Sequence, residues 1–145
     1  MKTGTEGLNL IKFYEGCKLT AYKCPAGIWT IGFGNTYYEN KSKIKEGDKI
    51  TKQRADDLLL NLLPTYEAIV KKKVTVPLTQ NQFDALVSYV WNTGGSDTLF
   101  KLINTKAADS QIRTWFETKY ITGGGKVLAG LVKRRKSEAD LFFKK

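Results

Sequence analysis

The sequence contains no histidine among its 145 residues. A Ser-His-Asp triad and a Cys-His pair are therefore excluded as nucleophilic centres, because both use imidazole as the base. A zinc site with histidine ligands is excluded as well, and two cysteines alone cannot complete a structural zinc site. Acid–base chemistry near neutral pH must come from carboxylates, thiols, lysine or tyrosine.

Long hydrophobic runs are also missing. No apolar run approaches the ~20 residues of a membrane-spanning helix, so we expect no stable membrane insertion. The short apolar stretch 8–11 is interrupted by Asn9 and does not read as a secretory signal. We therefore expect synthesis in a reducing cytoplasm, with Cys17 and Cys24 as free thiols. A disulfide between Cys17 and Cys24 that forms after release is an alternative that the sequence leaves open.

Acidic residues are few, 14 against 24 lysines and arginines, which gives a formal net charge of +10. Such a surface favours polyanionic partners, namely nucleic acid, acidic lipid or an anionic cell-wall polymer, unless the charge serves solubility alone. The length fits a single domain, residues 1–145, or two small lobes that share a core. An apolar content of 41% and only three prolines argue against disorder.

The chain opens with a predicted amphipathic helix over residues 3–14, because its apolar residues fall at helical spacing. Thr3 or Thr5 is the expected cap at its beginning. Gly16 is the expected stop. This arrangement places Glu15 in the last turn.

A small sheet and a long helix come next. β-branched and aromatic residues predict strands over 19–22 and 28–33, paired as an antiparallel hairpin or within a three-stranded sheet. A long helix is predicted from its cap Thr51 to about Lys73. Pro64 lies inside this helix and should kink it or split it in two.

The second half of the sequence is predicted to form helices only. Thr79 and Gln82 form a capping box before a helix that ends at Gly94. Three further segments follow: a helix over 107–120, a flexible loop over 123–125 and a basic helix over 128–143. Strands near the front and helices behind them predict the α+β class.

Glu15 is the first candidate for chemistry. The negative end of the helix dipole and the neighbouring Phe13 and Tyr14 disfavour its ionised form, and a general acid in glycoside cleavage must be protonated. Taken by itself, this position is better interpreted as an exposed glutamate at a helix end that has no function. The spacing Glu15-x8-Cys24-x5-Thr30 changes this, because the two strands fold back and can bring these positions to one cleft.

Several motifs resemble the lysozymes (endolysins) of tailed bacteriophages, which carry Glu, Asp and Thr at this spacing. The similarity covers nearly the whole chain in the right order. The matching segments are Phe13-Tyr-Glu-Gly16, Leu19-Thr-Ala-Tyr22, residues 28–34 (IWTIGFG), residues 82–94 (QFDALVSYVWNTG) and residues 130–135 (GLVKRR) with Glu138.

The resemblance implies hydrolysis of the β-1,4 bond between N-acetylmuramic acid and N-acetylglucosamine in peptidoglycan. Glu15 would protonate the leaving oxygen, Cys24 would assist the attacking water or stabilise the sugar cation, and Thr30 would hold that water. The implied fold is lysozyme-like: a small β-hairpin lobe of about 15–60 and a helical lobe of about 1–14 plus 61–145, joined by the long helix. Hinge motion about that helix would open and close the cleft.

The resemblance also bears on partners and location. Peptidoglycan is the expected partner, and its anionic character agrees with the positive charge of the chain. We expect a monomer with no metal and no cofactor. The enzyme would wait in the host cytoplasm until a membrane pore releases it to the cell wall.

Cys24 departs from the family, which usually has Asp there. An ordinary thiol has a pKa of ~8.5, so only a few per cent is thiolate at pH 7. Lys23 beside it can lower that pKa. Four roles stay open: a thiolate base or nucleophile, a dispensable residue in a transglycosylase-like reaction that Glu15 drives alone, a redox brake bridged to Cys17, and an inert buried cysteine.

Secondary candidates surround these positions. Glycines such as Gly34 allow a ligand close to the backbone, and Asn35 and Thr36 are expected to contact sugar. On the far wall we expect Trp91, with core packing as its alternative, and Asn92. A peptide carboxylate is expected to meet Arg135 or its neighbour Arg134, with a solvated helix face as the alternative.

Two rival functions remain. A nucleic-acid binder would use the basic clusters 71–73 and 133–136 with Trp115, but the clusters are scattered and no nucleic-acid motif is present, so we expect no nucleic-acid partner. A catalytically dead wall-binding module is the second rival, because the usual Asp is missing. Clearing of a cell-wall suspension separates both from an enzyme.

Overall fold

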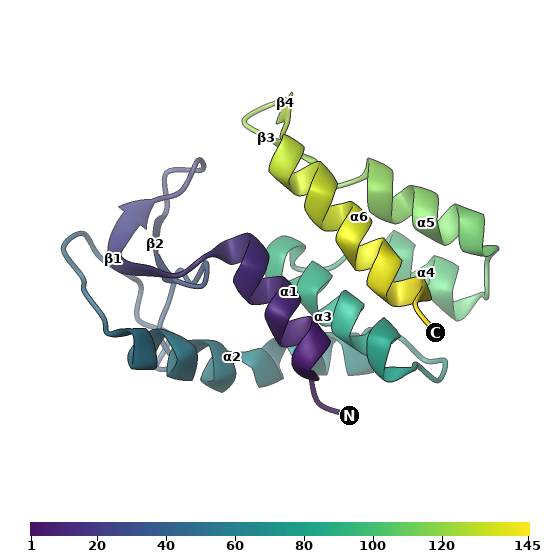
Figure 1. The fold of residues 1–145 in the computed structure, drawn as a ribbon, viewed down its shortest axis with the longest axis horizontal. Helices are drawn as coiled ribbons and strands as arrows, with labels where there is room; N and C mark the ends of the chain where they lie inside the picture. The colour runs from purple at the N-terminus through teal and green to yellow at the C-terminus, as the bar shows by residue number, and fades with distance from the viewer.

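The computed structural model describes residues 1–145 and has a hairpin at one end and a group of helices at the other (Figure 1). This arrangement confirms the predicted α+β class. Helix α2 passes beneath the hairpin and continues under the helical group, so it joins the two parts. The elements in chain order are α1 (Thr5–Glu15), β1 (Lys18–Lys23), β2 (Trp29–Gly32), α2 (Lys52–Lys73), α3 (Gln80–Thr93), α4 (Asp97–Asn104), α5 (Asp109–Thr118), β3 (Thr122–Gly123), β4 (Lys126–Val127) and α6 (Ala129–Phe143).

Helix α1 ends as predicted, since Gly16 follows its last residue with a φ of +66°. The predicted cap is wrong, because Gly4 precedes the helix and no local side chain caps it. Asp84 of α3 takes that role: its carboxylate oxygens accept hydrogen bonds from the amides of Gly4 and Gly7 at 2.9 and 3.1 Å. A cap supplied from 80 residues away has no local sequence signal.

The front sheet is a two-stranded antiparallel hairpin of β1 and β2. Gly27, with a φ of +79°, turns the chain between the strands, and its amide donates to the Cys24 carbonyl at 2.8 Å. The connector to α2 adds only isolated bridges, such as Thr20 to Lys49. The hairpin prediction is confirmed, and a full third strand does not form.

Helix α2 begins after Thr51, whose side chain accepts from the Arg54 amide, and runs unbroken to Lys73. Pro64 lies inside it without splitting it, so that part of the prediction is wrong. Proline removes one helical donor, and it therefore leaves one carbonyl of the preceding turn without its helical partner. Apolar residues of α2 face the core, and among them Leu58 and Leu59 are fully buried.

In the second half, both hydrogen bonds of the Thr79–Gln82 capping box are present, and Gly94 ends α3 in the left-handed conformation. Helix α4 was not predicted, although the side chain of Ser96 caps it. The predicted glycine loop is wrong, because residues 122–127 form a small hairpin turning at Gly124 and Gly125, both with positive φ.

Helix α3 lies at the centre of the core. Every residue from Phe83 to Trp91 is buried, and α1, α2 and α6 pack around it. The core continues into the hairpin part through Ile31, Phe33 and Ile44. None of the helices combines the length and the apolarity needed to span a membrane.

Candidate active site

Glu15 is the last residue of α1, and its side chain is 17% exposed. Arg134 of α6 reaches it from the helical part, and its Nη1 donates to Glu15 Oε2 at 2.8 Å. The end of α1 alone did not predict this partner, because Arg134 lies 119 residues away in the sequence.

Arg134 is held in place by buried partners. Its Nε donates to Glu138 Oε2 at 3.3 Å, and its Nη2 donates to the Ser88 carbonyl at 3.1 Å. The Ser88 hydroxyl donates to the same Glu138 oxygen at 2.7 Å. The Arg134 and Glu138 side chains are only 3% and 0% exposed. Because every member of this network is bonded to another, it fixes the donor that faces Glu15.

Gly34 closes the other side of the Glu15 carboxyl. A Cβ placed on this residue would lie 2.5 Å from Glu15 Oε1, closer than any side-chain atom can come. Its φ of +79° is also a conformation that favours glycine. Gly34 therefore lets the backbone after β2 approach the carboxyl directly, and we expect it to position that group rather than to bind a sugar.

Cys24 and Thr30 face each other across the hairpin. The Cys24 amide and the Thr30 hydroxyl both donate to the Ile28 carbonyl, each at 2.9 Å. Burial raises the pKa of the Cys24 thiol, but the nearby Ile28 and Ala26 amides outweigh it, so the net pKa lies below its usual range. The turn thus favours a thiolate at position 24.

The pKa of Tyr22, in β1, is affected by both Glu15 and Cys24. Burial raises the pKa of the Tyr22 hydroxyl, and the negative charges of Glu15 and Cys24 raise it further. Tyr22 also pairs with Thr30 across the hairpin, and Gly34, which approaches Glu15, lies two residues beyond β2. The hairpin and the loop after it therefore lie next to Glu15.

Asn35 does not face a ligand. Its side chain is buried with Oδ1 unpaired, and its amide and carbonyl both bond to Ile31 at 2.9 Å. The sugar contact expected of Asn35 is not supported, because the residue closes the loop after β2. Thr36 is half-buried and lines a cavity with Ile28.

Trp91 is 8% exposed, and its Nε1 donates to the Phe33 carbonyl at 3.0 Å. The core-packing alternative therefore describes it well. Arg135 is fully buried, pairs with Glu138 at 3.0 Å and donates to Asn92 Oδ1 at 2.7 Å. Burial leaves Arg135 unable to meet a peptide carboxylate, so that expectation is wrong. Asn92 is exposed and stays a candidate.

The roles of Ser88 and Glu138 were not predicted, although both residues lie in segments that carry the family motifs. The available signal was the spacing of Arg134 and Glu138, four residues apart on a predicted helix, which places them on one face. Nothing in the local pattern marked Ser88, because its partners come from a helix about 50 residues away.

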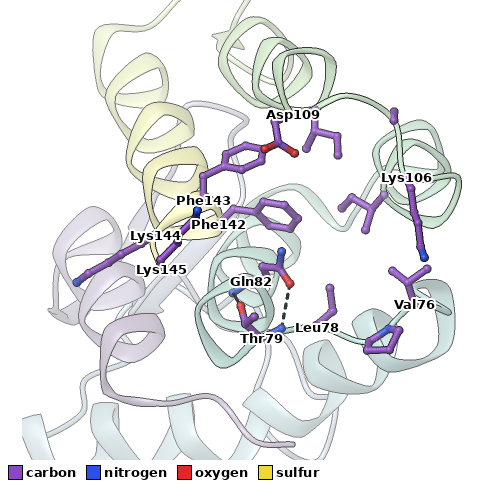
Figure 2. Close-up of a pocket in the computed structure, with 14 residues that line it drawn as sticks. Val76, Leu78, Thr79, Gln82, Lys106, Asp109, Phe142, Phe143, Lys144 and Lys145 are labelled. Carbon is purple, nitrogen blue, oxygen red and sulfur yellow. Dashed lines mark hydrogen bonds between the residues drawn. The ribbon is translucent and has the colours of Figure 1, made fainter.

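A cavity of about 640 Å³ lies elsewhere, between the start of α3, the α4–α5 connection and the end of α6. Figure 2 shows the Phe142 ring pointing into it and the hydrogen bond between Thr79 and Gln82 at its wall. None of the candidate site residues lines this cavity. We therefore do not assign the reaction to this cavity, although it is large.

Comparisons with known proteins agree on one family. The "Phage lysozyme" family model matches residues 12–138. The chain is 38% identical to an endolysin of Acyrthosiphon pisum secondary endosymbiont phage 1, over 98% of both chains. It is similar in structure to an endolysin from Escherichia coli O157:H7 phage FAHEc1 (TM-score 0.85, 36% identity, 99% and 94% of the two chains). The muramidase domain of SpmX from Asticaccaulis excentricus is also similar (TM-score 0.83, 31% identity, 99% of both chains).

Proposed function

This chain belongs to the phage lysozyme family, and from that membership we propose a catalytic assignment to Glu15, Cys24 and Thr30. The protein is a glycoside hydrolase of the lysozyme type, an endolysin that acts on peptidoglycan. The bond cleaved is the β-1,4 linkage between N-acetylmuramic acid and N-acetylglucosamine. The observation that carries the assignment is the place of Glu15, which Arg134 binds and Gly34 approaches, next to the hairpin whose strand β2 bears Thr30 and whose strand β1 leads into Cys24.

Glu15 acts as the general acid in this proposal. It gives its proton to the glycosidic oxygen as the bond to the leaving sugar breaks. Arg134 and Gly34 fix the carboxyl from two sides, which supports this role because a proton donor must be held at the reacting oxygen.

Cys24 acts as a thiolate. It takes a proton from the attacking water, or adds to the sugar carbon and is later displaced by water, and Thr30 holds that water. Burial raises the pKa of the Cys24 thiol, but the Ile28 and Ala26 amides lower it overall, and this direction supports a thiolate. The inert alternative lacks this support, because the sulfur is half-buried beside polar groups rather than enclosed in the core.

The pH dependence of wall clearing tests the thiolate. Activity should rise with pH and level off below the ~8.5 of an ordinary thiol, because the base form increases up to its pKa. Cys24→Ser should lose about 100-fold or more, whereas Cys24→Asp should work without the alkaline rise. Full activity in Cys24→Ser would end the thiolate proposal. Glu15→Gln is the control for the acid and should be inactive.

The same assay separates the remaining roles of Cys24. A transglycosylase-like reaction would release a sugar with an anhydro ring, which mass spectrometry of the product detects. A redox brake would make wild-type activity depend on reductant, and Cys17→Ser would remove that dependence. Both cysteines are free thiols in the structure.

We also propose the two-lobe division, with residues of about 15–60 as the catalytic lobe and about 1–14 plus 61–145 as the helical lobe. The protein would act as a monomer and reach the wall through a membrane pore. Light scattering of the purified protein tests whether it is a monomer. Co-expression with and without a pore-forming protein tests the route to the wall, since lysis should need both proteins.

A further inference from the structure

A second cavity, of about 580 Å³, lies in the loop region that follows the hairpin. Its wall is formed by five residues, two of them lysines, whereas 14 residues line the cavity of Figure 2. We call this set of residues the lysine subsite. Its members are Ile28, Thr36, Tyr37, Lys41 and Lys43.

The lysine subsite adjoins the proposed catalytic positions through Ile28. The Ile28 carbonyl accepts from the Cys24 amide and from the Thr30 hydroxyl, both at 2.9 Å. Its side chain is 51% exposed and lines the cavity. The cavity therefore begins beside the turn that carries Cys24 and Thr30.

The loop that carries the lysines is well ordered by its own hydrogen bonds. The Tyr38 amide donates to the Ser42 carbonyl, and the Lys41 amide donates back to the Tyr38 carbonyl, both at 2.9 Å. Asn40 Oδ1 accepts from the Ser42 amide at 3.0 Å. Tyr37 and Lys43 form an antiparallel bridge. The lysine backbones are thus held in place before any ligand arrives.

The two lysines carry uncompensated charge. Neither ammonium lies within 4.0 Å of a carboxylate oxygen. The nearest acid in sequence, Glu39, is instead bound to Arg54 by two hydrogen bonds of 2.7 and 2.6 Å. Two free ammonium groups beside the apolar faces of Ile28 and Tyr37 suit a ligand with carboxylates on a partly apolar chain.

We propose that the lysine subsite binds the carboxylates of the acidic stem peptides of peptidoglycan. This inference rests on the proposed function, because the peptide is attached to the glycan that is cleaved. Lys41 and Lys43 would pair with the carboxylates, and Ile28 would contact the aliphatic part of the peptide. The subsite would make the enzyme prefer walls whose stem-peptide carboxylates are free rather than amidated.

The test uses untreated cell walls and the same walls with their carboxylates amidated by carbodiimide and ammonia. Lys41→Gln/Lys43→Gln is compared with Lys45→Gln/Lys49→Gln, a pair in the same region that does not line the cavity. Both double variants lower the formal charge of +10 by two. Thermal unfolding checks that both remain folded.

On untreated walls, Lys41→Gln/Lys43→Gln should raise KM about three- to tenfold with kcat unchanged, the range for two exposed ion pairs. Amidation should raise the wild-type KM equally and should not affect that variant further. Lys45→Gln/Lys49→Gln should change KM less than twofold. Equal effects of the two double variants, or additive effects of substitution and amidation, would overturn the proposal.

A binding measurement keeps this inference separate from the proposed function. A soluble disaccharide with an acidic stem peptide is titrated into the wild type while backbone amide NMR shifts are followed. Shifts at Thr36, Tyr37 and Lys43 that disappear with the amidated disaccharide support the subsite. Their absence counts against the subsite, whereas clearing of walls by Glu15→Gln counts only against the catalytic assignment.

Discussion

At the scale of single residues, the site depends on close approach as much as on charge. Gly34 and Arg134 hold the Glu15 carboxyl from opposite sides, one by having no side chain and the other by a buried guanidinium. Cys24 depends on backbone amides that the turn after β1 directs at its sulfur. Small changes in these positions should therefore affect activity more than stability.

Gly34→Ala tests the close approach. The new methyl group would clash with Glu15 Oε1 and displace the carboxyl, and a displacement of about 1 Å lowers activity on the order of 100-fold. Gly27→Ala is the matched control, since Gly27 has the same φ of +79° but nothing within 4 Å of the added atom. Both variants should lose about 1 kcal/mol of unfolding free energy. Only Gly34→Ala should fail to clear walls, and equal activity of the two would contradict this explanation.

At the scale of elements, helices and loops are positioned by polar contacts from distant parts of the chain. Asp84 of α3 caps α1, and Glu39 of the connector binds Arg54 and Asn61 of α2. These contacts determine where α1 begins and where the loop with the lysine subsite lies. Each makes a measurable prediction for stability.

Asp84→Ala should destabilise the protein by about 2 kcal/mol, because the amides of Gly4 and Gly7 lose their acceptor on the buried side of α1. Urea unfolding measures the change. Asp97→Ala removes an aspartate whose side chain is 86% exposed and should stay within about 0.5 kcal/mol of wild type. A loss for Asp84→Ala no larger than that of the control would mean that the cap contributes little.

The Glu39–Arg54 pair predicts a pH-dependent stability. The hydrogen bonds from Arg54 lower the pKa of Glu39 to about 2, below the ordinary 4.5 of the unfolded chain. The pair therefore stabilises the fold fully above about pH 5, and its contribution is lost as the pH falls through 4.5 toward 2.

Urea unfolding of wild type and Glu39→Gln between pH 7 and 2 measures this contribution. The difference in unfolding free energy should be about 1 kcal/mol or less at pH 7, since both side chains are partly exposed to solvent, and should shrink toward zero near pH 2. A difference that is independent of pH would show that packing, not charge, explains the effect of the substitution.

At the scale of the whole molecule, the hairpin and the helical part meet at few specific contacts besides α2. Trp91 of α3 donates to the Phe33 carbonyl at 3.0 Å and packs against Tyr66 of α2, with ring centres 4.7 Å apart. These contacts lie where a hinge about α2 would have to act. They connect the part that carries Cys24 with the part that carries Arg134.

Trp91→Phe keeps an aromatic ring but removes the donor to Phe33. We expect a loss of about 1 kcal/mol in unfolding free energy and faster amide hydrogen exchange in β1 and β2, because the hairpin is less firmly attached. Trp115→Phe, in α5, is the matched control and should leave hairpin exchange unchanged. Unaltered exchange in Trp91→Phe would show that α2 alone holds the two parts together.

The sequence by itself determined the local elements and the candidate acid. Apolar spacing, the Thr79–Gln82 box and Gly16 are local signals, so α1, α2, α3, α6 and the front hairpin could be predicted from them. The E-x8-C-x5-T spacing likewise singled out Glu15 as the candidate acid. Short elements with weak periodicity, such as α4 and the hairpin of β3 and β4, could not be recognised in this way.

Only the tertiary structure decided which groups meet. Arg134 beside Glu15 is 119 residues away, and Asp84 at the start of α1 is 77 to 80 residues away. The same is true of burial, which placed Asn35 and Arg135 inside the protein although their residue types suit a binding surface. A side chain's partner and its exposure depend on how elements pack, and sequence periodicity reports only the face on which a residue lies.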